Sequence, residues 1–412
     1  MRDYDLVVIG GGAAGMLASG IAAERGLGVL LLERNKILGK KLRITGKGRC
    51  NLTNDTAVDK VIENIPTGGR FLHSALNEFS PGDTMKLFEA LGIPLKTERG
   101  GRVFPLSDNA DDIAEALRRY MGTTGVAVKH QRAKRLITQD GAISGVLTET
   151  GAIGCRSVIL ATGGMSYPAT GSTGDGYEMA GALGHNITEI RGSLVPLNAQ
   201  PDMCGAMQGL TLKNVRLSVY AGGKKPVYED FGELLFTHFG VSGPTVLSAS
   251  VHMRDFTADS YTLLVDLKPG LDEKKLDARI QRDFSKYLNR NFSNALDDLI
   301  SKSMIPVIVD RSGIKPDTKV HSVTREQRTR LVSLLKAFEI TADSPRPVEE
   351  AIITSGGVDL REINPKTMES KLVRGLYFAG EIIDADAYTG GFNLQIAWST
   401  AYAAGRSASQ DR

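Results

Sequence analysis

The sequence predicts an α/β fold in which a parallel-sheet domain is interrupted by an inserted region. Three observations lead to this prediction. A β-branched run at residues 5–9 is followed by a glycine cluster, an alanine-rich helical segment and a second apolar run at 29–33. From about residue 194 the pattern changes to the alternation of half-exposed antiparallel strands, and then to helical spacing. Residues 376–380 return to the pattern of a buried strand.

The strands at 5–9 and 29–33 should lie parallel, because the helical segment 13–25 connects them as a crossover. Residues 157–161 form a further buried strand in this interpretation. A hairpin of 126–136 with 143–148 precedes it. The predicted first domain therefore consists of residues 1–193 and 355–412.

The insertion is predicted at residues 194–354. Alternating strands are expected at 210–219, 234–236 and 261–267, and a helical subdomain at about 272–340. Thr324-Arg325-Glu326-Gln327 has the pattern of a capping box, which places a helix start before Leu331.

Composition excludes several classes of function. The 412 residues carry a formal charge of +3, and the basic stretch 36–49 is interleaved with glycine and apolar residues, so no basic stripe and no nucleic-acid partner are expected. No apolar run approaches the roughly 20 residues that span a bilayer, so no membrane partner is expected. The three cysteines lack paired spacing, which disfavours a metal site and a disulfide framework and favours the reducing cytoplasm.

A dinucleotide-binding motif follows the first strand. Gly10, Gly12 and Gly15 have the GxGxxG spacing, which permits a tight turn, a close approach of backbone to pyrophosphate and close packing of helix on strand. Glu33 ends the second strand, where its carboxylate can accept hydrogen bonds from a ribose diol. This predicts a Rossmann-like domain that binds FAD or NAD.

The C-terminal segment favours FAD. Residues 377–381 read as a strand that runs into a glycine turn, and Gly390-Gly391 opens an alanine-rich helix. The N-terminus of this helix can point at a flavin ring, where its partial positive charge favours negative charge on the reduced ring.

Several stretches make the chain resemble flavoproteins of the glutathione-reductase and fumarate-reductase type. They are Ala161-Thr162-Gly163-Gly164, Thr173-Gly174-Asp175-Gly176 and Phe378-Ala379-Gly380-Glu381. More narrowly, the chain resembles the BaiN-like and aminoacetone-oxidase-like bacterial flavoproteins in residues 39–51, 101–105, 237–244, 354–358 and 389–395. This resemblance implies an FAD domain interrupted by a β-barrel-like domain and a small helical domain.

The motifs and the resemblance together give a set of expected FAD-binding residues. Lys40, Lys41 and Arg49 are expected near the phosphates or the flavin, Val128 near adenine through its backbone, and Asn393 and Gln395 near polar atoms of the flavin. The full set is Gly10, Gly12, Ala13, Ala14, Gly15, Glu33, Arg34, Lys40, Lys41, Thr45, Gly46, Arg49, Cys50, Asn51, Val128, Ala161, Thr162, Gly163, Gly164, Gly380, Glu381, Asp384, Gly391, Phe392, Asn393, Leu394 and Gln395.

For catalysis the candidates are His238 for proton transfer, and Arg49 and Tyr167 for orienting an anionic or carbonyl substrate. Cys50 has no second cysteine at the spacing of disulfide reductases, so a packing role is expected for it. No metal is expected.

Three functions remain open at this point. The first is a reductase that transfers a hydride between flavin and a small organic substrate, with NADH or NADPH as a transient donor because no second GxGxxG unit is present. The second is an oxidase of an amine or aminoketone that uses oxygen. The third is non-enzymatic, either a flavin-binding redox sensor or an RNA-associated module, although the near-neutral charge and the lack of a basic stripe count against nucleic acid. The sequence leaves the substrate and the oligomeric state open.

Overall fold

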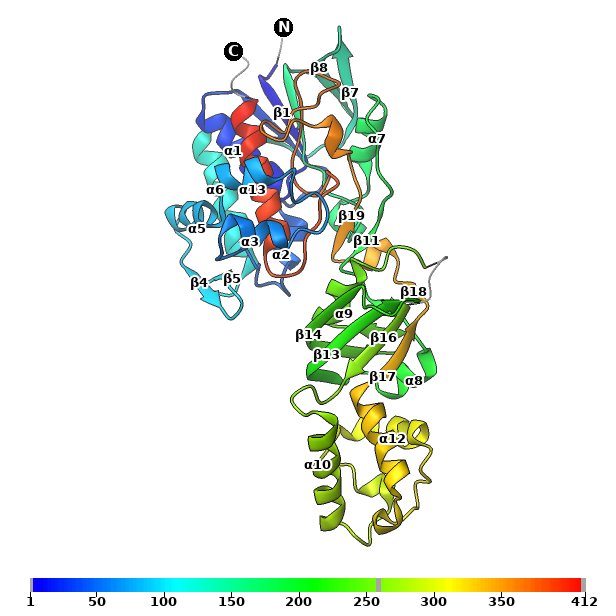
Figure 1. Cartoon of the computed structure of the whole chain (residues 1–412). Coiled ribbons are helices and arrows are strands. Elements are labelled where there is room, and N and C mark those ends of the chain that lie inside the picture. The colour runs from blue at the N-terminus through cyan, green and yellow to red at the C-terminus, as the bar shows by residue number, and fades with distance from the viewer. Residues whose placement is uncertain (1–2, 257–260, 409–412) are drawn as a thin grey trace. The chain divides into compact units, whose positions relative to one another are not determined.

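The structure is a computed structural model that describes residues 3–256 and 261–408 (Figure 1). The chain divides into two compact units. The first consists of Met1–Ser193 and Val348–Arg412, and the second of Leu194–Pro347.

A five-stranded parallel sheet forms the centre of the first unit. Its strand order is β20-β10-β1-β2-β6, and every neighbouring pair is parallel. The strands predicted near residues 5–9, 29–33, 157–161 and 376–380 are confirmed, and the last of them returns to the same sheet. The bounds are β1 (Leu6–Ile9), β2 (Val29–Leu32), β6 (Ala127–Lys129), β10 (Ser157–Leu160) and β20 (Leu376–Phe378).

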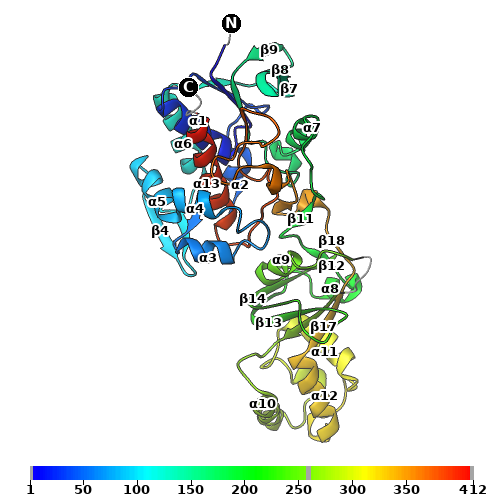
Figure 2. The same ribbon diagram turned by 45° about the horizontal axis from the view of Figure 1, so that its top comes forward.

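Both faces of this sheet are covered, because successive side chains of a strand point to opposite faces. Leu6 and Val8 pack into one cluster with α1 (Ala13–Glu24), α6 (Ala110–Thr124) and α13 (Phe392–Ser407). Val7 and Ile9 pack on the other face against a small antiparallel sheet of β7 (Ala133–Gln139), β8 (Ala142–Thr148) and β9 (Gly151–Gly154). Figure 2 shows this small sheet beside the helical layer.

The segment 126–136 differs from the expectation of one hairpin strand. Ala127–Lys129 joins the parallel sheet as its edge strand β6, and only the part from Ala133 onward pairs with β8. The free edge of β2 offers a parallel partner to the first part. A run of β-branched and polar residues does not show which of two sheets it joins.

The remaining elements of the first unit surround this core. They are α2 (Lys40–Ile44), α3 (Val58–Glu63), α4 (His73–Glu78), α5 (Pro81–Ala90), α7 (Asp175–Gly181), the three-stranded sheet of β3 (Thr53–Asn54), β5 (Arg102–Pro105) and β4 (Leu95–Glu98), and the pair β11 (Arg191–Ser193) and β19 (Ile353–Ser355).

The second unit contains a seven-stranded antiparallel sheet in the order β17-β16-β13-β14-β15-β12-β18. The strands at the two edges of this sheet, β17 (Phe338–Ala342) and β18 (Ser344–Pro345), follow one another in the chain. The two edges must therefore approach each other, which gives the sheet the curled form expected of a barrel-like domain. The other strands are β12 (Leu197–Asn198), β13 (Thr211–Ala221), β14 (Tyr228–Thr237), β15 (Gly240–Ser242) and β16 (Tyr261–Asp266).

Helices complete the second unit. The predicted capping box is confirmed, since Thr324 Oγ1 accepts from the Gln327 N–H (3.2 Å) and Gln327 Oε1 accepts from the Thr324 N–H (2.9 Å). The helices are α8 (Pro201–Ala206), α9 (Pro244–Ser250), α10 (Glu273–Lys286), α11 (Ile305–Ser312) and α12 (Arg325–Lys336). Among the described residues of both units, no helix combines the length and the apolar character needed to cross a membrane.

Candidate functional site

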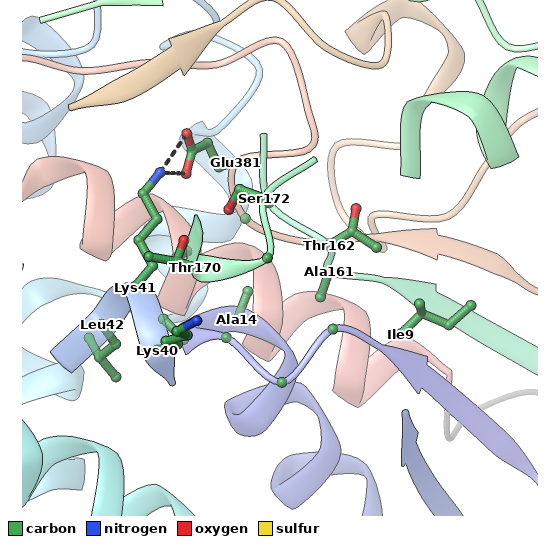
Figure 3. A pocket seen from close by; sticks show the side chains of 18 of the residues that line it. Ile9, Ala14, Lys40, Lys41, Leu42, Ala161, Thr162, Thr170, Ser172 and Glu381 are labelled. Carbon is green, nitrogen blue, oxygen red and sulfur yellow. Dashed lines mark hydrogen bonds and ion pairs between the residues drawn. The ribbon is translucent and has the colours of Figure 1, made fainter. Parts of the chain in front are cut away.

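The principal cavity of the first unit lies at the carboxyl ends of the parallel strands, where ligands bind in open α/β sheets. Figure 3 shows it between the turn after β1, the start of α2 and the segments after β10 and β20. The predicted residues that line it are Gly10, Gly12, Ala13, Ala14, Glu33, Arg34, Lys40, Lys41, Thr45, Ala161, Thr162, Gly163, Gly380, Glu381, Asn393 and Leu394.

The three glycines of the motif have different surroundings. Gly10 has φ +106°, and a Cβ there would collide with the Ala161 carbonyl. A Cβ on Gly15 would collide with the Gly10 carbonyl oxygen, so helix and strand pack here with no room for a side chain. A Cβ on Gly12, in contrast, would have no protein atom within 4 Å. Gly12 therefore leaves space that a ligand can fill.

The N-terminus of α1 is suited to an anion. Gly12 is the N-cap and forms no side-chain cap, and the first turn holds no acidic residue. The free N–H groups and the positive end of the helix dipole thus face the cavity beside Gly12. The space at Gly12 and these donors fit the pyrophosphate of a dinucleotide.

Glu33 lies in the cavity wall at the end of β2, as expected. Its Oε2 accepts from the Gly11 N–H (2.7 Å), and its Oε1 accepts from the backbone N–H and the side-chain amide of Asn35 (2.7 and 2.8 Å). These bonds fix the carboxylate while Oε2 keeps a free lone pair among the described contacts, which fits a ribose hydroxyl. No pattern in the sequence indicated that Gly11 and Asn35 would hold the Glu33 carboxylate.

Two arginines meet Asp175 at the Glu33 end of the cavity. Arg132 donates to Asp175 through two nitrogens (2.7 and 3.0 Å), and Arg34 donates to Thr173 (2.6 Å) and Asp175 (3.3 Å). Burial acts to raise the pKa of Asp175, but the hydrogen bonds from Arg132 and Thr173 outweigh it and the pKa is lowered. The Thr173-Gly174-Asp175-Gly176 motif indicated Asp175, whereas no sequence pattern indicated Arg132.

Lys41 has a different partner from the phosphate expected for it. Its ammonium donates to both carboxylate oxygens of Glu381 (2.7 and 3.0 Å) and to Ser166 Oγ (2.7 Å), as Figure 3 shows for Glu381. Glu381 also accepts from the Thr354 N–H (2.8 Å). The pair links α2 to the segment after β20 across the cavity wall. Lys40 donates to the Ala169 carbonyl (2.5 Å).

The first turn of α13 also lines the cavity, through Asn393 and Leu394. The Asn393 amide exchanges hydrogen bonds with Ala387, donating to its carbonyl (2.8 Å) and accepting from its N–H (2.9 Å). Asn393 therefore fixes the loop before the helix. The helix N-terminus, with Gly391 as N-cap and no acidic residue in the first turn, supplies the partial positive charge expected there.

Gln395, expected near polar atoms of the flavin, does not line the cavity. Its side chain is fully buried and all four of its hydrogen bonds are made within the protein. The amide oxygen accepts from Thr53 and Thr84 (2.6 and 2.9 Å), and the amide nitrogen donates to the Phe79 carbonyl and to Ser399 (3.0 and 2.9 Å).

Arg49, expected near the flavin or substrate, lies outside the cavity lining. Its guanidinium donates to Asp108 (2.6 and 2.8 Å) and Glu98 (2.5 Å) and stacks over the Phe104 ring at 4.2 Å. These contacts tie Arg49 to the loop after β5. Cys50 is fully buried, and burial raises the pKa of its thiol to about 12, which agrees with a packing role.

The other predicted residues also lie outside the lining. Tyr167 is exposed and has φ +53°. His238 is exposed in the turn after β14 of the second unit, with its ring edge-on to Phe239. The remainder are Gly15, Gly46, Asn51, Val128, Gly164, Asp384, Gly391 and Phe392.

Comparison with known proteins decides the family. The model of the family described as HI0933-like protein Rossmann domain matches residues 4–407. The chain belongs to this family. This HI0933-like chain is 31% identical to a 3-dehydro-bile acid delta(4,6)-reductase of Clostridium scindens, over 98% of each chain. It is 30% identical to a ribosomal RNA dihydrouridine synthase of Escherichia coli, over 98% of this chain and 97% of the relative.

Solved structures show the same fold at low identity. A flavocytochrome c3 fumarate reductase in its open conformation matches with a TM-score of 0.54 and 18% identity, over 99% of this chain and 78% of that one. A 3-ketosteroid delta1-dehydrogenase from Sterolibacterium denitrificans matches with a TM-score of 0.56 and 14% identity, over 99% and 100%. The HI0933-like chain is an oxidoreductase with the FAD-binding fold that the sequence predicts.

Proposed function

We propose that the chain uses bound FAD to reduce a carbon–carbon double bond conjugated with a carbonyl group, with NADH or NADPH as a transient donor. The supporting observation is what the two relatives share over their whole lengths. One is named as a delta(4,6)-reductase of a 3-dehydro-bile acid, and the other as a dihydrouridine synthase. Both names describe saturation of such a bond, since dihydrouridine is uridine with its ring double bond reduced.

The cavity supports this proposal through the way it would hold FAD. The N-terminus of α1 and Gly12 would bind the pyrophosphate, Glu33 the ribose, and the first turn of α13 the flavin end. Lys41 and Glu381 would support the wall between these ends. Bound FAD, once reduced by NADH or NADPH, would supply the hydride, and the protein would supply position, electrostatics and exclusion of water.

The reaction needs one hydride on the carbon β to the carbonyl and one proton on the α carbon. The described cavity lining holds no histidine, cysteine or tyrosine. We therefore propose that water delivers the proton, in place of His238, the donor that the sequence predicts, which belongs to the second unit. A reducing compartment such as the cytoplasm belongs to the same proposal, supported by three buried cysteines without a disulfide.

Oxygen dependence tests the proposed function against its alternatives. The holoenzyme is mixed with NADH or NADPH and a conjugated steroid ketone, with and without oxygen, and the nicotinamide and the saturated product are both measured. The proposal expects anaerobic oxidation of NADH or NADPH that depends on the ketone and matches product formation. Consumption only with oxygen, with peroxide and no saturated product, would show that oxygen and not the ketone accepts the electrons, as in the oxidase alternative. No turnover under either condition would indicate a sensor.

A further inference from the structure

One large apolar side chain of the cavity lining is exposed. Ile352 lies in this lining and is 41% exposed. The other large aliphatic side chains that the structure describes in the lining are buried or half-buried, and they are Ile9, Leu32, Leu42, Met179, Ile353, Leu394 and Ile396. Ile352 therefore offers apolar surface that an occupant of the cavity can cover.

The backbone fixes Ile352 in this exposed position. Ala351 before it is fully buried, and Ile353 after it begins β19, is buried and pairs with Ser193 of β11. Because the neighbours on both sides are held inside the first unit, Ile352 cannot turn inward without breaking their packing. Its exposure is a property of the fold.

A second exposed large side chain comes from the segment after β10. Tyr167 in this segment is 38% exposed. The Met165 N–H donates to Thr354 Oγ1 (2.8 Å), and the Tyr167 N–H donates to the Glu349 carbonyl (3.2 Å). These bonds align the segment, in antiparallel direction, with the one that contains Ile352. We call Ile352 and Tyr167 the apolar rim.

The backbone of Tyr167 is held in an unusual conformation. Its φ is +53°, in the left-handed region that residues other than glycine seldom adopt. The Tyr167 carbonyl accepts from the N–H and from Oγ1 of Thr170 (2.8 and 2.7 Å), which keeps the turn in place. Backbone strain that the surrounding bonds maintain clusters at ligand contacts. This conformation supports a functional reason for the exposure of Tyr167.

The cavity wall beside the apolar rim carries no free charge from its ion pair. The Lys41 ammonium has three N–H groups, and it donates to Ser166 Oγ (2.7 Å) and to both carboxylate oxygens of Glu381 (2.7 and 3.0 Å). Ser166 Oγ also lies 3.5 Å from the Ile352 carbonyl oxygen, which places this pair next to the rim. Since Lys41 has no N–H left for an anion, the wall suits an uncharged group.

We propose that the apolar rim binds the fused ring system of the conjugated ketone and so makes the chain selective for large, uncharged ring ketones. The expected FAD-binding residues include none from 349–353, which leaves this surface to the substrate. Covering the two side chains removes apolar surface from water, and this favours binding in proportion to the area covered. The inference rests on the proposed function for the reaction and on the rim alone for binding.

The test uses the FAD-loaded full chain with Ile352→Asn and with Tyr167→Asn, since asparagine tolerates the left-handed backbone. Ile352→Leu and Tyr167→Phe are the conservative variants. The matched control is Ile37→Asn, which changes an isoleucine of the first unit that is 56% exposed and lies outside the lining. Binding of androstenedione to the oxidised holoenzyme is measured from the change in flavin absorbance. Anaerobic turnover with NADH or NADPH gives kcat and KM for androstenedione and for the single-ring ketone cyclohexenone.

Each asparagine variant at the rim should weaken androstenedione binding and raise its KM on the order of tenfold. The kcat should change little, because a contact made equally in the ground state and the transition state affects KM alone. Cyclohexenone, which covers less of the rim, should be affected less. The two conservative variants and the control should behave as the wild type, and all variants should retain FAD.

Losses of the same size in the control or in the conservative variants would overturn the inference. So would asparagine variants that lose FAD while their affinity for androstenedione is unchanged, because the rim would then contact the cofactor. A wild type that reduces cyclohexenone but does not bind androstenedione would also overturn it. Binding of androstenedione that depends on the rim, without turnover of either ketone, would instead refute the proposed function and leave the rim assignment intact.

Discussion

At the residue scale, one glycine of the GxGxxG motif is required for folding and another for binding of the cofactor. Gly15 is needed because the Gly10 carbonyl leaves no room for a Cβ, whereas Gly12 faces open space. Gly12 has φ −82°, which any residue adopts. A side chain at Gly12 should therefore leave the fold intact and interfere only with binding of the cofactor.

We predict that Gly12→Val folds but is purified without FAD, because the branched side chain occupies the space left for pyrophosphate. The measurement is flavin absorbance per protein, with circular dichroism and thermal unfolding as checks of folding. Gly15→Val is the matched comparison and should fail to fold. Full FAD occupancy in Gly12→Val would show that the phosphates bind elsewhere.

Other site residues could be predicted only in part. Glu33 was found because its distance from the glycines in sequence is set by one strand-helix-strand unit, which is local geometry. Arg49 and Gln395 were expected near the flavin because they belong to stretches that resemble those of flavoproteins. Their actual partners, Asp108 and Thr84 among them, come from other segments, and no pattern in a single sequence reveals such pairings.

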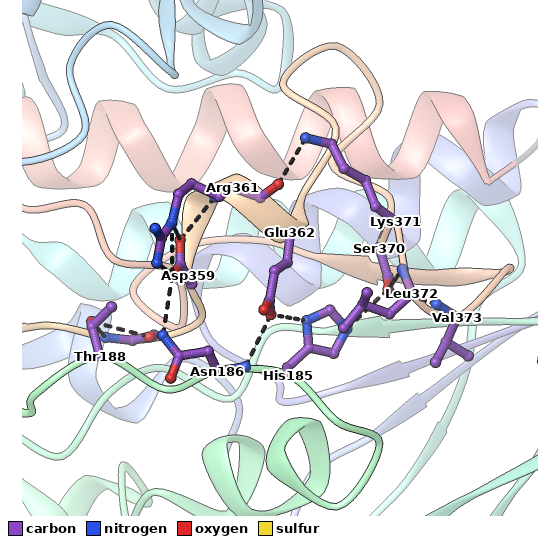
Figure 4. Close-up of polar contacts among 11 residues, drawn as sticks. His185, Asn186, Thr188, Asp359, Arg361, Glu362, Ser370, Lys371, Leu372 and Val373 are labelled. Atoms are coloured by element: carbon purple, nitrogen blue, oxygen red, sulfur yellow. Dashed lines mark hydrogen bonds and ion pairs between the residues drawn. The ribbon is translucent and has the colours of Figure 1, made fainter.

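At the element scale, a buried polar cluster fastens the segment after α7 to the excursion between β19 and β20 (Figure 4). His185 Nδ1 lies 3.1 Å from Glu362 Oε2, and its Nε2 lies 2.9 Å from Ser370 Oγ. Ser370 Oγ also accepts from the N–H groups of Leu372 and Val373 (3.0 and 2.9 Å). The Ser370 hydroxyl therefore donates its proton to Nε2 of His185, and this keeps the imidazole ring neutral. Neither the hydroxyl nor the ring is then available as a nucleophile.

Burial lowers the pKa of His185, and the opposing effect of Glu362 does not restore it. Because the folded pKa lies below the unfolded value of about 6.5, the unfolded chain binds the proton first as the pH falls. The stability that neutral His185 contributes is full above about pH 6.5 and is lost below it.

The prediction is that the free energy of unfolding in urea falls more steeply between about pH 7.5 and pH 5.5 in the wild type than in His185→Gln. Taking the difference between the two proteins removes the contribution of other groups such as Asp384, whose pKa burial raises. Parallel pH profiles for the two proteins would contradict the assignment of this cluster.

Helices and strands could be predicted where a capping box or a short run of apolar residues marks them. The capping box at Thr324 and the apolar runs of β1 and β2 are such cases. The division of 126–136 between β6 and β7 was not, because both halves read as strand and the choice of sheet depends on which edge is free.

At the scale of the whole molecule, the change in periodicity near residue 194 and the return of a buried strand near 376 predicted one sheet built from both ends of the chain. β20 pairs with β10 in parallel and so completes that sheet. The substrate could not be predicted from these patterns, because the fold fixes where FAD would bind and leaves the reacting partner to side chains around it.

The most direct test of the central claim follows the hydride. The holoenzyme is mixed without oxygen with a conjugated steroid ketone and with NADH or NADPH carrying deuterium at the transferred position, in separate reactions with each stereoisomer, so that the ketone is present while the flavin is reduced. The account predicts a saturated product with deuterium on the carbon β to the carbonyl and a proton from water on the α carbon. An alcohol formed at the carbonyl carbon, or flavin that stays reduced in the presence of the ketone, would contradict it.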